Sequence, residues 1–110
     1  MANSFKNSVV PSIGTTPVDV YTAGAGVTAT IISLSLASRI DYTAHVDVQI
    51  TDTSTANSAF LIKGAVIDPS GTFVLVGGDQ KLVLETTDKL TVTSSLASSV
   101  DCVISILEQV

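Results

Sequence analysis

The stretch VDVYTAGAGVTATIISLSLA, from Val18 to Ala37, consists of two runs rich in β-branched residues on either side of a turn at Gly24 to Gly26. β-Branched side chains favour a pleated strand, and glycines let the chain reverse at little cost. A helical period is absent from this stretch. The segment VGGDQKLVLETTDKLTVTSS, from Val76 to Ser95, is built in the same way. Both segments predict paired strands.

The composition of the 110-residue chain agrees with an all-β fold. Val, Ile and Thr supply 15, 9 and 14 residues, whereas Lys and Arg together supply only 5. Long helices would need more charged residues on their exposed faces. The length is close to the commonest domain size. We expect residues 9–110 to form a single antiparallel β-sandwich or jelly-roll-like domain of eight to nine short strands, and residues 1–8 to form a flexible N-terminal arm.

Turn signals recur about every 8–12 residues, as in β-sandwiches. Asp68 to Gly71 and Gly77 to Asp79 are two of these predicted turns. The runs between the turns are the expected strands: Val9–Ile13, Val18–Thr22, Val27–Ala37, Tyr42–Thr51, Ala59–Lys63 with Ala65–Ile67 continuing or turning it, Phe73–Val76, Lys81–Glu85, Leu90–Ser94 and Val100–Leu107.

The run from Val27 to Ala37 is expected to be a central, mostly buried strand. Its apolar residues change phase, from Val27, Ala29 and Ile31 to Ile32, Leu34 and Leu36. A β-bulge would produce this change, and so would a long strand that packs against two surfaces.

The run from Tyr42 to Thr51 alternates strictly between apolar and polar residues, which is typical of an antiparallel sheet with one solvated face. Its predicted buried face consists of Tyr42, Ala44, Val46, Val48 and Ile50.

The charge balance bears on the class of partner. A net charge of −5 argues against binding to nucleic acid or to an anionic membrane, since both need clustered Lys and Arg. The mean hydropathy of +0.53 is high, yet no apolar run approaches the roughly 20 residues that span a bilayer. The two observations together suggest that some apolar surface is buried between subunits.

Residues able to carry chemistry are few. His45 and Asp47 share the polar face of one expected strand, but a solvated strand face explains them better than a catalytic pair. Aspartates recur in the loops, and calcium is the metal to consider there, but the loop after Asp52 lacks EF-hand spacing. Cys102 alternates with apolar residues and is expected to be a buried hydrophobe. We therefore expect no enzyme activity and no cofactor.

Five segments together resemble a small β-sandwich module of tailed-bacteriophage virion proteins: Val20 to Ala37, Tyr42 to Asp52 (YTAHVDVQITD), Phe60 to Gly71 (FLIKGAVIDPSG), Val76 to Ser95 and Ser98 to Glu108 (SSVDCVISILE). The chain departs from that pattern in its turns. Ala23 to Gly26 and Asp68 to Gly71 stand where Pro-Ala-Gly is common, and Thr87-Asp88 stands where Gly-Asp is common.

The resemblance implies a virion structural protein made in the host cytoplasm, an origin with which the absence of a secretory signal agrees. It favours a capsid decoration or cement protein that binds the major capsid protein, or another virion protein, as a homo-oligomer, with a trimer favoured. The alternative is a neck or tail accessory protein that binds a host receptor or glycan through the loops Asp52 to Ser58 and Asp68 to Gly71. The candidate interface residues are Phe5, Val9, Val10, Ile13, Asp52, Asn57 and Pro69.

Overall fold

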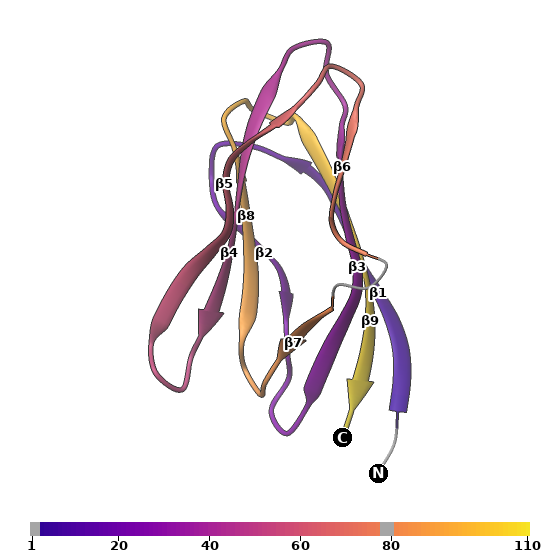
Figure 1. Cartoon of the computed structure of the whole chain (residues 1–110), viewed down its shortest axis with the longest axis vertical. Helices are drawn as coiled ribbons and strands as arrows, with labels where there is room; N and C mark the ends of the chain where they lie inside the picture. Colours follow the sequence, from indigo (N-terminus) through magenta and orange to yellow (C-terminus); the bar gives the residue numbers. More distant parts are fainter. Residues whose placement is uncertain (1–2, 78–80) are drawn as a thin grey trace.

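The computed structural model describes residues 3–77 and 81–110 of the chain. Within these ranges the protein is all-β: nine strands form two antiparallel sheets that pack face to face (Figure 1). The predicted β-sandwich is confirmed. The molecule is elongated along its strands, with extents of 45 × 27 × 22 Å.

One sheet has five strands. β1 (Asn3–Ile13), β9 (Val100–Gln109), β3 (Thr28–Ser38) and β6 (Thr72–Val76) follow one another in that order. β7 (Leu82–Leu84) shares an edge of β3 with β6, because it pairs with Ala29 to Ile31 while β6 pairs with Leu34 to Ala37. β3 therefore lies in the interior of this sheet, as its sequence predicted.

The other sheet has four strands, in the order β2 (Val18–Thr22), β8 (Lys89–Ser94), β4 (Ala44–Asp52) and β5 (Asn57–Ile67). β5 includes both predicted runs, Ala59–Lys63 and Ala65–Ile67, in one continuous strand. The pairing of β4 with β5 shifts register near Val48, close to Gly64, whose φ is +66°. Asp47 Oδ1 accepts a hydrogen bond from the Gly64 N–H at 2.7 Å, which supports the chain at this irregularity.

The N-terminal segment corrects one expectation. Asn3 to Ser8, expected to belong to a flexible arm, form the first part of β1 and pair residue by residue with β9, from Asn3 opposite Gln109 to Ser8 opposite Ile104. The polar composition of the segment misled the prediction. An edge strand at the rim of a sandwich needs few apolar residues, because its backbone hydrogen bonds to the neighbouring strand hold it in place.

The phase change within β3 is a β-bulge. The register between β3 and β9 shifts between Ile31 and Ser33, so Ile32 is the extra residue. Ile31, Leu34 and Leu36 are fully buried, and Ile32 is only half-buried. The bulge keeps the apolar residues on both sides of it directed into the core.

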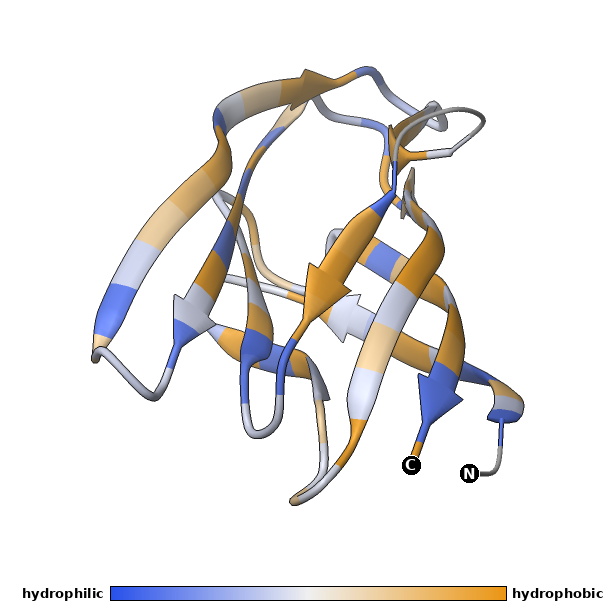
Figure 2. Ribbon diagram, turned by 60° about the horizontal axis from the view of Figure 1, so that its bottom comes forward, coloured by the Kyte–Doolittle hydropathy of each residue, from blue (hydrophilic) through white to orange (hydrophobic). Residues whose placement is uncertain are grey.

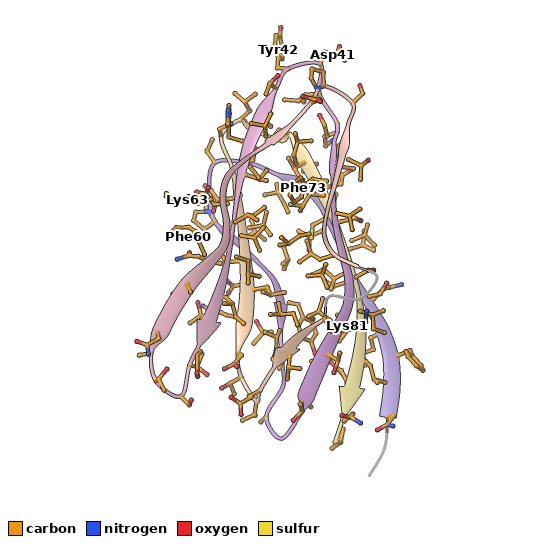
Figure 3. All side chains as sticks on the ribbon, viewed as in Figure 1. Asp41, Tyr42, Phe60, Lys63, Phe73 and Lys81 are labelled. Atoms are coloured by element: carbon orange, nitrogen blue, oxygen red, sulfur yellow. The ribbon has the colours of Figure 1, made fainter. Side chains whose placement is uncertain are left out.

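Tyr42 corrects a second expectation. It was assigned to the buried face of its strand, but β4 begins two residues later, at Ala44, and Tyr42 is exposed. In Figure 3 its side chain projects from one end of the sandwich. The alternation of apolar and polar residues starts before the first residue that pairs with a neighbouring strand.

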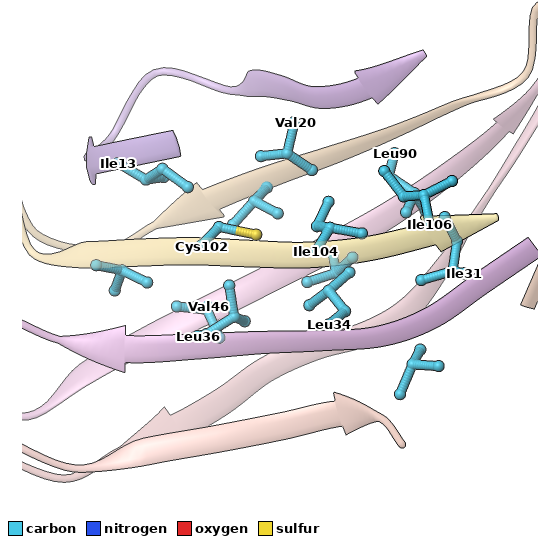
Figure 4. Close-up of a cluster of buried hydrophobic side chains, with 14 of the residues drawn as sticks. Ile13, Val20, Ile31, Leu34, Leu36, Val46, Leu90, Cys102, Ile104 and Ile106 are labelled. Carbon is cyan, nitrogen blue, oxygen red and sulfur yellow. The ribbon is translucent and has the colours of Figure 1, made fainter. Parts of the chain in front are cut away.

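The core lies between the two sheets and is made of aliphatic side chains (Figure 4). Cys102 lies among them, fully buried, as predicted. Burial raises the pKa of its thiol to about 12, so the group stays protonated and behaves as a small hydrophobe. The fully buried Ile and Leu residues of the core include Ile31, Leu34, Leu36, Leu84, Leu90, Ile104 and Ile106.

The turn between β5 and β6 forms as predicted, with one difference. The Gly71 N–H donates to the Asp68 carbonyl at 2.8 Å, but the positive φ of 58° belongs to Ser70. Gly71 is needed for space, because a Cβ there would lie 3.0 Å from the Asp68 carbonyl oxygen. The predicted turn at Gly77 to Asp79 lies in part outside the described residues.

We predict that Leu34→Ala lowers the free energy of unfolding by about 2–5 kcal/mol, because the removed methyl groups leave a cavity between the sheets. Urea denaturation followed by circular dichroism measures the loss. Ser33→Ala, on the outward side of the same strand, is the control and should change stability by less than about 0.5 kcal/mol. Equal losses in the two variants would contradict the assignment of inward and outward faces.

Candidate interaction surface

The outward side of the five-stranded sheet follows from strand register. Residues directly opposite each other in antiparallel strands project to the same face. Since Cys102, Ile104 and Ile106 of β9 enter the core, their neighbours in sequence project outward. The outer face consists of Asn3, Phe5, Asn7 and Val9 of β1, Asp101, Val103, Ser105, Leu107 and Gln109 of β9, Thr28, Thr30, Ser33, Ser35 and Ala37 of β3, Thr72 and Val74 of β6, and Val83 of β7.

This outer face is almost free of charge. Asp101 is its one charged residue within the described strands, and it lies at one end. There the Arg39 guanidinium pairs with the Asp101 carboxylate at 3.0 Å and also donates to the Ser12 hydroxyl. Figure 2 shows that β9 as a whole is mostly apolar, with hydrophilic residues at its C-terminal end. The rest of the surface consists of methyl, hydroxyl and amide groups and one aromatic ring.

A shallow groove of about 380 Å³ runs along this face between β1, β9 and β3. The bulged Ile32 contributes to its lining, together with Phe5, Lys6, Asn7, Ser105 and Ile106. Phe5 is 79% exposed. An exposed aromatic ring beside a groove is typical of an interaction surface.

The outer face of the four-stranded sheet is different in kind. It carries an ion pair between Lys89 and Asp19 at 3.5 Å, and Asp19 also accepts from the Thr91 hydroxyl at 3.0 Å. The Lys63 ammonium lies 4.4 Å from the centre of the Phe60 ring, on the outer side of β5 (Figure 3). This face is the hydrated one, so the two sides of the sandwich differ in charge.

His45 and Asp47 both lie on the hydrated face of β4, as expected. The Asp47 carboxylate is used by the Gly64 N–H, and the His45 backbone N–H donates to the Ser95 hydroxyl at 3.0 Å. Both interactions support the fold. Neither residue lines the groove of the outer face or the cleft beside Asp52.

A second cleft, of about 280 Å³, lies beside the β4–β5 hairpin. Asp52 and Asn57, both interface candidates, line it together with Asp88. Asp52 accepts from the backbone N–H and the hydroxyl of Ser54, and the hydroxyl hydrogen bond contributes most to lowering the pKa of Asp52. Asp88 is buried and accepts from the N–H groups of Glu85 and Thr53. The cleft is built by interactions that close turns.

The structure separates the seven interface candidates. Phe5 and Val9 lie on the uncharged outer face, and Val10 is half-buried against the core. Ile13 is 1% exposed and belongs to the core, which removes it as a contact residue, because its strand turns inward there to meet Val100.

Asp52 and Asn57 lie at one end of β5, and Pro69 lies beyond its other end. Eleven residues of β5 hold the two loops about 30 Å apart. The loops Asp52 to Ser58 and Asp68 to Gly71 therefore do not form one contact surface. That part of the sequence-based alternative is corrected.

A network at the end of the sandwich nearest the termini holds β1 in place. The Tyr21 hydroxyl of β2 donates to Glu108 Oε2 of β9 at 2.5 Å, and the Lys6 ammonium of β1 lies 2.9 Å from Glu108 Oε1. Burial and the hydrogen bond to Glu108 raise the pKa of Tyr21. The pKa of Glu108 is lowered, mainly by the hydrogen bond from the Tyr21 hydroxyl and next by the hydrogen bond from Lys6. The Glu108 carboxylate thus connects the edge strand β1 with β2 of the opposite sheet.

Sequence reasoning found two residues of the outer face and missed most of the others. Val103, Ser105 and Leu107 alternate with the predicted core residues of the last strand, and this signal was available. The role of Ile32 and the alignment of β1 with β9 depend on register, which the sequence did not supply.

No group of three or more His, Cys, Asp or Glu residues within the described ranges is arranged to hold a metal ion. The described part of the chain also has no helix of the length and apolarity needed to cross a membrane. Comparison with known proteins found no matching protein family and no similar curated protein.

We predict that Tyr21→Phe lowers the free energy of unfolding by about 1–2 kcal/mol at pH 7, because a hydrogen bond to a partly buried carboxylate is lost. The lowered pKa of Glu108 contributes stability above its unfolded value of about 4.3, and this contribution is lost as the pH falls through the folded pKa. The difference between wild type and variant should therefore narrow below about pH 4. Urea unfolding at a series of pH values measures it, and a constant difference from pH 7 to pH 3 would contradict the network.

We predict that Asp88→Ala costs about 1–3 kcal/mol, since two backbone N–H groups lose their acceptor. Asp41→Ala, in the exposed segment before β4, is the control and should be nearly neutral. Thermal unfolding of both variants checks the difference. No loss for Asp88→Ala would show that these donors are satisfied by water.

Proposed function

We propose that the chain is a non-enzymatic structural protein of a tailed-bacteriophage particle: a capsid decoration protein that binds the shell as a homo-oligomer. In this role it is made in the host cytoplasm and found in the virion. Its partner is the major capsid protein or a neighbouring virion protein. The segment pattern that resembles virion β-sandwich modules supports this role, and the uncharged outer face of the five-stranded sheet supplies a surface for it.

The uncharged face is the observation on which the proposal rests. Charged groups are costly to remove from water, whereas methyl and hydroxyl groups are buried more readily. Four strand positions about 4.8 Å apart and about ten residues long give a face of about 600 Å². This is the same order as the roughly 800 Å² that each partner buries in a standard interface.

The hydrated face of the four-stranded sheet complements this arrangement. With one face against the shell, the ion-paired residues of the other sheet remain in water, where they cost nothing to keep charged. Each bound copy adds contact area that favours the assembled shell by mass action, and linked copies add avidity.

Immunogold electron microscopy of purified particles that encode the chain tests the proposed role. Labelling over the head supports a decoration protein. Labelling at the neck or tail contradicts head decoration and favours the accessory role that the sequence left open. Absence of the chain from purified particles, measured by mass spectrometry, would overturn both.

The docking face is tested by a matched pair of variants. Val103, 42% exposed, lies in the middle of the uncharged face, and Val66, 52% exposed, lies on the hydrated face. We predict that Val103→Lys reduces binding to particles lacking the protein by at least ten-fold, because an ammonium group would be buried in the interface. Val66→Lys makes the same change in net charge and should bind within two-fold of wild type. Pelleting assays with both variants measure the effect, and equal binding would sink the assignment of the face.

A further inference from the structure

β1 leaves one edge of the five-stranded sheet open. It is the first strand in the order β1-β9-β3-β6, and in the described structure it forms a ladder only with β9. The N–H and C=O groups that point away from β9 belong to no strand ladder in the described structure; the contact of β1 with β2 is a side-chain one, in which the Ser8 hydroxyl donates to the Val20 carbonyl at 2.7 Å. An open edge of this length is a template for another strand.

The other edges of the sandwich are less suited to pairing. β2 has five residues and a register shift, and β5 has two register shifts and the left-handed Gly64. The far edge of the five-stranded sheet is divided between the short strands β6 and β7. Proteins usually protect exposed edges by such short strands and bulges. β1 has such devices only at its far end, where Pro11 and a register shift lie between Val10 and Ile13. Its pairing with β9 is regular from Asn3 to Val10, and the one lysine in that stretch, Lys6, pairs with Glu108 of the neighbouring strand.

We propose that β1 pairs antiparallel with β1 of a second copy of this chain, about a two-fold axis that passes through Asn7. The inference deepens the homo-oligomeric part of the proposed function. Antiparallel pairing of a strand with its own copy is self-complementary, as a two-fold interface requires. The chain carries a charge of −5, but Lys6 is the only charged residue in β1, so two copies meet at this edge with little charge repulsion.

The side chains of β1 select this register. With the axis at Asn7, Phe5 of each copy lies opposite Val9 of the other. Aromatic and β-branched residues form favourable cross-strand pairs. Lys6 then lies opposite Ser8 of the second copy, and Pro11, which has no N–H, lies at the end of the ladder opposite Asn3. An axis at Lys6 would place the two ammonium groups opposite each other, and an axis at Ser8 would place Phe5 opposite Pro11.

This pairing accounts for two exposed apolar side chains. Phe5 is 79% exposed and Val9 61% exposed, and both lie on the outward side of an edge strand. A two-fold axis perpendicular to the sheet keeps both outer faces on the same side. The product is a continuous ten-stranded sheet with a doubled uncharged face. The contact produces pairs of copies, so it replaces the trimer that the sequence resemblance favoured.

Multi-angle light scattering over a range of concentrations tests the contact in the isolated full chain. We expect wild type to reach twice the monomer mass of 11.3 kDa. Val9→Lys should raise the dimer dissociation constant at least ten-fold, because both Phe5–Val9 pairs are lost and lysine is a residue that protects open edges. The matched control is Val74→Lys, since Val74 lies on the same face at the opposite edge and is 62% exposed. A monomer at all concentrations, a trimer, or equal weakening by both variants would overturn the proposal.

Cysteine cross-linking tests the register. Opposite residues in an antiparallel pair have Cα atoms about 4.5–5.5 Å apart, within the range of a disulfide. Asn7→Cys should therefore form a covalent dimer under mild oxidation. Phe5→Cys is displaced from its own copy by four residues and should not, and the buried Cys102 should not contribute in either variant. Cross-linking of Phe5→Cys but not of Asn7→Cys would overturn the register.

The results separate this inference from the proposed function. A cross-linked dimer that is absent from virions keeps the β1 contact and removes the decoration role. A protein that decorates particles but is monomeric or trimeric in solution, with no cross-link at position 7, keeps the role and removes the contact.

Discussion

The burial of one side of β9 is the constraint on which the rest of the structure depends. Cys102, Ile104 and Ile106 pack into the core, and a shift of one residue would turn all three toward water. The inward and outward sides of β9 are therefore fixed. The residues that alternate with Cys102, Ile104 and Ile106 must then project outward, and so must the residues directly opposite them on β1 and β3. The uncharged outer face is thus a direct consequence of the core.

The two outer faces of the sandwich differ in charge. On the four-stranded sheet, Asp19 and Lys89 interact with each other and with water, and Asp47 supports the irregular part of β5. On the five-stranded sheet, hydroxyl and methyl groups alternate over most of the surface. Such groups tolerate water but lose little when they are covered. A face of this kind can be covered over a broad area without a deep pocket.

The N-terminal strand shows which features a local sequence pattern cannot predict. Apart from Phe5, the residues from Asn3 to Ser8 are polar, and nothing within the segment marks it as a strand. Its partner is β9, about 100 residues later in the sequence, and Glu108 joins it to Tyr21 on the opposite sheet. Tyr42 shows the reverse error, since the alternating pattern includes a residue that precedes the first paired residue of β4. In both cases the decisive interaction came from a distant segment.

The sequence by itself determined the strand class, the approximate position of each strand, the phase change in β3 and the burial of Cys102. These features depend on β-branched side chains, turn residues and alternation, all of which act between near neighbours in the chain. Only the tertiary structure decided that β1 extends back to Asn3, that Ile13 is buried, and that the two candidate loops lie at opposite ends of β5. It also decided that fifteen scattered Phe, Val, Leu, Ala, Ser, Thr and Asn residues join into one face. Strand order is set by contacts between segments far apart in sequence, and a local pattern carries no record of which segment will lie beside it.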